Sequence, residues 1–341
     1  MKRIIGLGLG VVVLAALAWI AWWFVAAEGQ RNAFDLWLEK QRERGWQAEA
    51  ATIEMSGFPG AFQLTVTDLL LADPRNDWSW SAPVLKAESS SAAPTRIAVD
   101  WPDTQTVGTT EDQITISAGK LATLLDLRPG PSMELREAAT DAEGLVLKAR
   151  SGWVGSAKSV NVQILERSEG TAPPNTYNLR GNAKGVKLPK EVLDDLDPTG
   201  LLKPQVETVT FVGHAAFDAP VDRRTVEESA LAIRAATIRE AGFAWGDMKL
   251  VVNGAFQVDD AGYPVGKMNI EAEQWEKIVK LATKSGVIDD GMAETITGAV
   301  KLLTALSGGG DTLSLPLRLK GGEVRLGPIA IADAPRLAPP R

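Results

Sequence analysis

The chain begins with a long uncharged segment, which restricts the possible folds more than any other feature. Residues 4–27 contain no Lys, Arg, Asp or Glu, and Lys2, Arg3 and Glu28 flank them. As a helix this segment would be roughly 36 Å long, enough to cross a hydrocarbon core of about 30 Å. Tryptophans near its second end resemble aromatic anchors at a membrane interface. We therefore expect a transmembrane anchor over residues 1–27. Its anchor positions are Ile4, Leu14, Trp19, Trp22, Trp23 and Phe24.

A cleaved secretory signal is the competing interpretation of this segment. Val25, Ala26 and Ala27 are small residues of the kind that precede a cleavage site. However, the apolar run is longer than the roughly 7–15 residues usual in such signals, and bulky rings lie beside the candidate site. Positive charges occur on both sides of the segment, so their count alone does not decide the orientation. Long domains cross membranes largely regardless of charge, and we expect the N-terminus to be cytoplasmic.

Composition limits the chemistry that the rest of the chain can perform. The chain has 341 residues, no cysteine, one histidine and a formal net charge of -7. A net negative charge without basic clusters argues against a nucleic-acid partner. The absence of cysteine removes disulfides, thiolate nucleophiles, iron–sulfur clusters and most structural zinc sites. No cofactor and no metal site is expected.

The spacing of apolar residues changes from helical to alternating at Gly45. Residues 28–45 predict a juxtamembrane helix, which would either lie on the membrane surface or cap a sheet. Beyond it, apolar and polar residues alternate in at least five segments, as in antiparallel strands with one apolar face. Asp259–Gly262 predicts a hairpin turn with Gly262 at its positive-φ position. The alternating segments are residues 62–66, 160–164, 248–258, 268–272 and 313–326.

Helical spacing recurs in fewer places. We expect helices over residues 119–127, 189–196, 271–284 and 289–306. The proline pair at Pro173 and Pro174 marks the clearest break. The predicted fold class is α+β: a single N-terminal transmembrane helix, then a mostly antiparallel, curved β-sheet domain with flanking helices, as one sheet or two similar halves. The expected divisions are 1–27, 28–45, 46–172, 173–334 and a proline-rich tail over 335–341.

Several short motifs occur in an order that resembles a known family. Gly57-Phe58-Pro59 follows the first helix, then come Trp78 and Trp80, and near the end Pro316, Gly327 and Pro328. Together they resemble the DUF2125 family, uncharacterised envelope proteins of alphaproteobacteria. The resemblance implies an inner-membrane anchor with N-terminus cytoplasmic and the bulk in the periplasm, and it brings no established activity or catalytic residue.

A second, looser similarity involves residues 245–266. The segment that begins at Trp245-Gly246-Asp247 and ends at Gly266 is similar to strand–turn–strand units of AsmA-like envelope proteins. Those proteins are thought to move or shield lipids along a hydrophobic β-groove. The similarity implies membrane lipid as a partner.

Known catalytic patterns are absent from the sequence. His214 lies in an apolar, strand-like stretch with no accompanying partner motif, so a structural role is expected. No Gly-x-Ser-x-Gly motif and no phosphate-binding glycine loop occurs. The chain has 11 tryptophans, and core packing is the default role for those outside the first segment. Some could instead line an apolar groove.

Two functions of different classes remain. In the first, the domain binds or shields lipid in an apolar β-groove and serves envelope maintenance. In the second, it is a non-enzymatic envelope scaffold that binds another protein. An enzyme is not expected, because no residue is nominated for catalysis.

Overall fold

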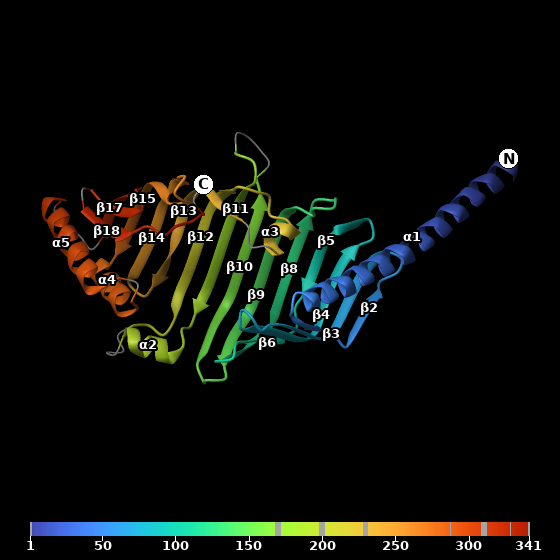
Figure 1. Ribbon diagram of the computed structural model, residues 1–341, viewed down its shortest axis with the longest axis horizontal. Coiled ribbons are helices and arrows are strands. Elements are labelled where there is room, and N and C mark those ends of the chain that lie inside the picture. The colour runs from blue at the N-terminus through green and yellow to red at the C-terminus, as the bar shows by residue number, and fades with distance from the viewer. Residues whose placement is uncertain are drawn as a thin grey trace. The chain divides into compact units, whose positions relative to one another are not determined.

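The chain folds into two compact units, each built on antiparallel strands. The computed structural model describes residues 2–167, 172–197, 202–227, 231–286, 288–307, 312–327 and 329–339. The first unit contains Met1–Ser117, Leu121–Asp126 and Ala149–Ser151. The second contains Ala118–Lys120, Leu127–Lys148 and Gly152–Arg341. Figure 1 shows the elements of both units.

The first unit combines one long helix with short and long strands. Helix α1 is Lys2–Glu43. The strands are β1 Gln47–Glu49, β2 Thr52–Ser56, β3 Ala61–Asp73, β4 Trp78–Ser90, β5 Ala93–Asp100, β6 Thr104–Gly108, β7 Gln113–Ser117 and β8 Lys120–Leu127. Strand β3 pairs with β1, β2 and β4, and β4 also pairs with β5 and β6. All of these pairings are antiparallel.

Helix α1 packs on this sheet through its own apolar residues. Leu38 is 1% exposed and lies in a core with Val66 and Leu69 of β3. Trp23 is 4% exposed and stacks on Phe62 with a ring separation of 5.5 Å. Its indole Nε1 donates to the carbonyl oxygen of Ala61 at 2.9 Å. Apolar side chains of the helix are therefore used to cover the sheet of the first unit.

The structure contradicts the expected single transmembrane helix. Among the described residues, no helix is both long enough and apolar enough to cross a membrane. The helix does not end where the uncharged segment ends, because α1 continues through Glu28, Arg31 and Asp35 to Glu43. Trp23 and Ala27, which the sequence placed in the anchor, are buried against protein. Part of the uncharged run is therefore explained by packing of α1 on the first unit's sheet.

The second unit is a wide sheet with short helices. Its strands are β9 Leu135–Ala149, β10 Val154–Glu166, β11 Thr176–Val186, β12 Val206–Phe217, β13 Ile233–Trp245, β14 Met248–Val258, β15 Pro264–Glu273, β16 Thr312–Lys320, β17 Glu323–Leu326 and β18 Ile329–Asp333. Each pairs antiparallel with the next along the chain. Its helices are α2 Lys190–Leu196, α3 Arg223–Glu227, α4 Trp275–Lys284 and α5 Asp290–Ser307.

One face of this sheet is apolar, as the alternation predicted. Leu313, Leu315 and Leu317 of β16 are buried, whereas Ser314 and Pro316 between them are exposed. Helices α4 and α5 lie at the β14–β18 end of the sheet (Figure 1). Trp275 of α4 and Val300 of α5 close an apolar core over β15 and β16. The mostly antiparallel sheet with flanking helices is confirmed.

Two local predictions had different outcomes. The turn at Asp259–Gly262 is confirmed, since the Gly262 N–H donates to the Asp259 carbonyl at 3.0 Å and Gly262 has φ +86°. The helix expected over residues 119–127 is wrong, because this segment is strand β8. Its pairing with β5 places Leu125 opposite Ile97 and Thr123 opposite Val99. Helical spacing is also matched by Leu121, Leu124 and Leu125. The segment nevertheless forms a strand, because it pairs with β5.

Candidate functional site

An apolar row crosses the second unit and defines the candidate site. Residues opposite each other in antiparallel strands share a face of the sheet. The pairing of β10 to β16 places the following residues side by side: Val160, Ala183, Val209, Phe243, Leu250, Ala272 and Leu313. At one end Ala272 and Leu313 are buried beneath α4 and α5. Toward the other end Val209 is 42% exposed.

A cavity of about 380 Å³ opens on this row between the sheet and helices α2 and α4. We call it the α4 groove. The strands contribute Val206, Val209, Phe243, Trp245 and Leu250, the helices contribute Leu196, Ile278, Leu281 and Ala282, and Ser285 follows the end of α4. Apart from the Ser285 hydroxyl and the Trp245 indole N–H, these side chains carry no polar group. The size lies within the range of small-molecule sites, and the lining favours hydrocarbon.

Trp245 lines the α4 groove and has no spare polar atom. It is 6% exposed, and its Nε1 donates to the carbonyl oxygen of Lys203 at 2.7 Å. Because the N–H is already satisfied, the ring presents only apolar surface to the groove. The sequence left open whether some tryptophans pack in a core or line an apolar groove. Trp245 lines a groove.

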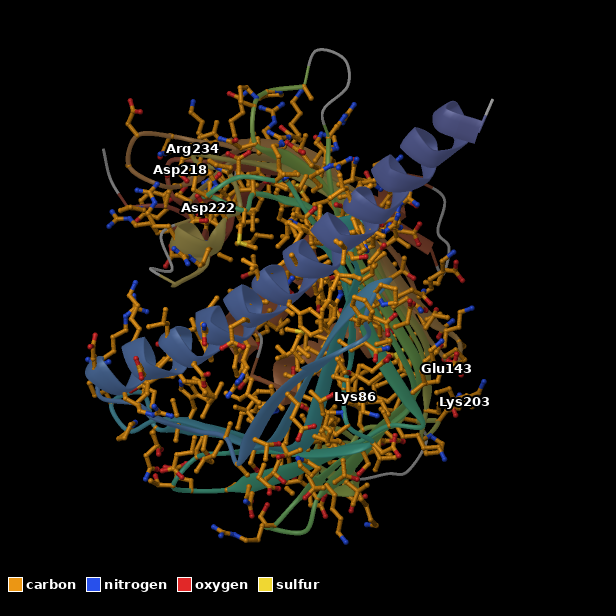
Figure 2. The ribbon with its side chains drawn as sticks, turned by 90° about the vertical axis from the view of Figure 1, so that its right-hand side faces the viewer. Lys86, Glu143, Lys203, Asp218, Asp222 and Arg234 are labelled. Carbon is orange, nitrogen blue, oxygen red and sulfur yellow. The ribbon has the colours of Figure 1, made fainter. Side chains whose placement is uncertain are left out.

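Ion pairs connect the elements around the groove. Lys277 of α4 contacts Asp247, in the turn between β13 and β14, at 2.5 Å, which lowers the pKa of that carboxyl. The Gly246 N–H and then Lys203 lower the pKa of Glu207. Lys203 and Glu207 are 3.0 Å apart, and Figure 2 shows Lys203 at the surface. None of these four charged side chains is among the residues that line the groove.

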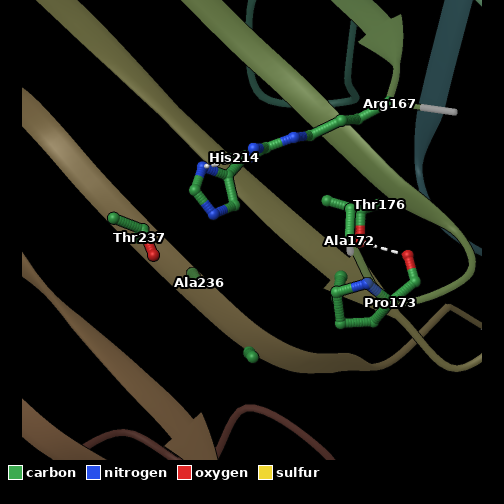
Figure 3. Close-up of a pocket in the computed structure, with 9 residues that line it drawn as sticks. Arg167, Ala172, Pro173, Thr176, His214, Ala236 and Thr237 are labelled. Carbon is green, nitrogen blue, oxygen red and sulfur yellow. Dashed lines mark hydrogen bonds between the residues drawn. The ribbon is translucent and has the colours of Figure 1, made fainter. Parts of the chain in front are cut away.

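A second, smaller cavity of about 260 Å³ lies around His214 (Figure 3). Arg167 Nη1 is 3.5 Å from His214 Nδ1, and the Thr176 hydroxyl donates to the Pro173 carbonyl. Burial, then Arg167 and Arg239, lower the pKa of His214. The groups that act on the ring are cationic, and among the described residues no carboxylate orients it as a catalytic base requires. Within the part of the chain that the structure describes, the site therefore has no nucleophile–base pair.

No metal centre is indicated by the placed side chains. Across the described ranges, no group of three or more His, Asp or Glu residues is arranged to hold a metal ion. Asp218, which Figure 2 shows beside Arg234, forms an ion pair with it at 3.2 Å. The acidic side chains of the second unit named here are therefore used in pairs with basic ones.

Gly57, Phe58 and Pro59 attach helix α1 to the first unit's sheet. Phe58 stacks on Phe24 with ring centroids 5.6 Å apart. The peptide bond before Pro59 is cis, and the Pro59 carbonyl accepts from Trp19 Nε1 at 3.3 Å. Gly57 has φ +96°, and a Cβ there would lie 2.8 Å from the Ala61 carbonyl oxygen. The motif therefore packs against α1, and the motif alone did not indicate that contact.

The other expected anchor and motif positions do not form one site. Trp22 is 42% and Leu14 67% exposed on α1, and Ile4 lies in α1 without a described side chain. Trp78 packs edge-on against Trp46, and Trp80 donates to Gln105 Oε1 at 2.7 Å. Pro316 is an exposed residue of β16, Gly327 has φ +59° at the turn before β18, and Pro328 lies outside the described residues.

Sequence reasoning missed the groove as a site, although it found the parts. The alternation over residues 248–258 and the helical spacing of Ile278 and Ala282 were both visible. What the sequence could not show is that α2 and α4 meet the row at Val209 and Phe243. That arrangement depends on contacts between residues far apart in the chain.

The comparisons with known proteins agree with the motifs. A family model described as "Uncharacterized protein conserved in bacteria (DUF2125)" matches residues 23–335. No curated protein and no solved structure matches the chain. Since the match covers most of the chain, the protein belongs to the DUF2125 family.

Proposed function

We propose that the protein binds a lipid acyl chain in the α4 groove and thereby holds or shields lipid at the bacterial cell envelope. The observation that carries this proposal is the α4 groove, a cavity of about 380 Å³ with an almost wholly apolar lining. A polar substrate would lose its hydration there without gaining partners. An acyl chain has no polar groups to dehydrate, and it would contact Phe243, Trp245 and Leu250.

The length of the apolar row suits an acyl chain. From Val160 on β10 to Leu250 on β14 the row crosses four interstrand spacings, each about 4.8 Å, or roughly 19 Å in all. One leaflet of a bilayer is about 15 Å of hydrocarbon, half of the roughly 30 Å core. A single chain therefore fits along the row. The similarity of residues 245–266 to AsmA-like units supports the same function.

Extraction of bound lipid tests this proposal. The full chain would be purified, its bound lipids extracted and their amount per protein measured by mass spectrometry. We expect about one acyl chain per groove in the native protein and a loss of most of it in Ala282→Trp, whose ring fills the cavity. Glu276→Trp, on the exposed part of the same helix, is the matched control and should retain lipid. The proposal would be refuted if the native protein contained no lipid and also failed to bind added fatty acid.

We also propose an envelope location, with the bulk of the chain in the periplasm at the inner membrane of an alphaproteobacterium. The family resemblance supports it. So does the exposed apolar surface of α1, where Leu17 is 56% and Val25 74% exposed, because such surfaces contact lipid or protein. A reporter enzyme that is active only in the periplasm, fused to the C-terminus, should be active. A cytoplasmic signal would contradict the location.

The same α1 surface favours the second candidate function, a non-enzymatic scaffold that binds another envelope protein. A photo-crosslinker at Leu17 would distinguish the two in living cells. Capture of one defined protein supports the scaffold, whereas crosslinks to lipid alone support the lipid function. A crosslinker at exposed Glu54 of β2 is the control for random capture.

A further inference from the structure

The face of the second unit's sheet opposite the α4 groove carries a separate pair of cavities. Successive side chains of a strand point to opposite faces, so His214 and Val209, five positions apart on β12, face opposite ways. The same holds for Lys267 and Ala272 on β15. The cavity of about 260 Å³ around His214 and a cavity of about 500 Å³ lined by Lys267 share residues 235–237 of β13 as lining. The two cavities therefore adjoin.

The first cavity is lined by hydrogen-bond donors that lack acidic partners. Arg167 forms no ion pair with any residue that the structure describes, and its Nη1 lies 3.5 Å from His214 Nδ1. Figure 3 shows the Arg167 side chain ending beside the His214 ring. Thr237 is directly opposite His214 on β13, and its hydroxyl forms no hydrogen bond with a described residue. The guanidinium, the ring and the hydroxyl are all available to a ligand.

The charges around His214 are mostly positive. Burial, then Arg167 and Arg239, lower the pKa of the ring. Arg180 of β11 and Glu240 of β13 are both paired with the residue two positions before His214. Over the described ranges, no Asp or Glu lines either cavity. An anion would therefore be attracted to this place, although the whole chain carries a net charge of -7.

The second cavity continues the positive charge. Lys267 is exposed and forms no ion pair within the described part of the chain. Arg318 of β16 is directly opposite it and is also exposed. Like charges opposite each other destabilise a sheet, so a bound anion would relieve their repulsion. From β12 to β15 the strands cover three spacings, or roughly 14 Å, which is the length available to a ligand.

We propose that the two cavities bind a phosphate monoester, whose phosphate lies between Arg167 and His214 and whose organic part extends over residues 235–237 toward Lys267. The site is separate from the α4 groove, and it does not depend on the lipid function. A guanidinium presents paired N–H donors that match two phosphate oxygens, and the ring and the Thr237 hydroxyl add single donors. The phosphate supplies the counter-charge that Arg167 lacks.

NMR of the His214 ring measures binding at this place, because His214 is the chain's one histidine. The probe is glycerol phosphate, titrated into the full-length protein. We expect a saturable change in the ring signals and a rise in the pKa of His214, since a bound anion favours the imidazolium. Lysophosphatidic acid carries the same headgroup on an acyl chain. Similar affinities with the same ring shift indicate a soluble ester as ligand, and tighter binding of lysophosphatidic acid with that shift indicates a lipid headgroup.

Arg167→Gln is the test variant. It should weaken binding of glycerol phosphate about tenfold or more, because it removes hydrogen bonds to a charged group. Thr237→Val keeps the shape of the side chain and should weaken binding by a smaller factor, about two- to tenfold. The matched control is Lys184→Gln, which removes a positive charge from the same face of the sheet. Lys184 is six positions along β11 from the residue opposite His214, or roughly 20 Å, so binding should be unchanged.

Three results would overturn the phosphate site. One is the absence of any saturable change in the His214 signals. Another is binding that leaves the ring signals and the pKa of His214 where they were. The third is equal weakening in Arg167→Gln and Lys184→Gln, which would mean that net charge alone attracts the probe. The proposal for the α4 groove stands in each case, because fatty acid binds on the other face.

Discussion

At the scale of single residues, backbone conformation explains why Gly57 occupies the joint between α1 and the first sheet. Its φ of +96° is unfavourable for residues with a side chain, and a Cβ would lie 2.8 Å from the Ala61 carbonyl oxygen. We expect Gly57→Ala to lower the free energy of unfolding by about 1–3 kcal/mol. Denaturant unfolding of the purified chain measures this loss.

Gly60 is the matched control for that substitution. It lies in the same turn, and a Cβ there would meet nothing within 4 Å. Gly60→Ala should therefore change the unfolding free energy by no more than about 0.5 kcal/mol. Equal losses in both variants would mean that the joint at Phe58 and Pro59 does not depend on the conformation of Gly57.

His214 offers a prediction about pH, and as the chain's one histidine its ring signal is easily assigned. Burial, then Arg167 and Arg239, lower its pKa in the folded protein. The unfolded state thus takes up the proton first as pH falls. The contribution of His214 to stability is complete above its unfolded pKa and is lost as pH falls from there through the lower folded pKa.

Removal of one of the charges near His214 should move this titration. We expect Arg167→Gln to raise the pKa of His214 toward its ordinary value, as followed by NMR of the ring protons. Arg150→Gln, which removes a charge from the other unit, should leave the midpoint unchanged. A midpoint that does not move in Arg167→Gln would show that the 3.5 Å contact is not formed in solution.

At the scale of elements, the alternation along β16 predicts which substitutions are tolerated. Leu315 is 6% exposed in the core beneath α4 and α5, whereas its neighbour Ser314 faces solvent. Leu315→Ala should lower the unfolding free energy by about 2–5 kcal/mol. Ser314→Ala removes an exposed hydrogen bond to Asn269 and should have little effect. Similar losses in chemical denaturation would contradict the one-faced sheet.

The elements also show how far sequence reasoning reaches. Period-two alternation was sufficient to identify the strands β10, β14, β15 and β16. In β16 it also identified the buried face, with Leu313, Leu315 and Leu317, whereas Val162 of β10 is 45% exposed. It failed over residues 119–127, where the apolar residues fit both the helical and the strand period. That segment is a strand because it pairs with β5. The uncharged segment was ambiguous for a related reason. The sequence does not distinguish apolar residues that face lipid from those that, like Trp23 and Ala27, pack near Phe62. Nonlocal contacts supplied the missing information in both cases.

The same limit applies to the candidate site. The helical spacing of Ile278 and Ala282 identified an apolar face of α4 but not what that face meets. Only the pairing of β12 with β13 and β14 brings Val209, Phe243 and Leu250 into one row beneath it.

At the scale of the whole molecule, the division into two units predicts that a lipid bound in the groove stabilises the second unit only. The groove residues all belong to the second unit, while α1 and the Gly57 joint belong to the first. Ligands stabilise the elements that they contact, and hydrogen exchange reports local opening. Bound lipid should therefore protect a defined part of the chain.

Hydrogen-exchange mass spectrometry with and without added fatty acid measures this protection. We expect slower exchange in peptides from α4 and from residues 206–217 and 243–250, and unchanged exchange in α1 and β1–β4. Ala282→Trp should abolish the difference, because the filled groove admits no chain. Protection confined to α1 would instead identify its exposed apolar surface, including Leu17 and Val25, as the place where lipid binds, and the α4 groove would then be only a gap between helix and sheet.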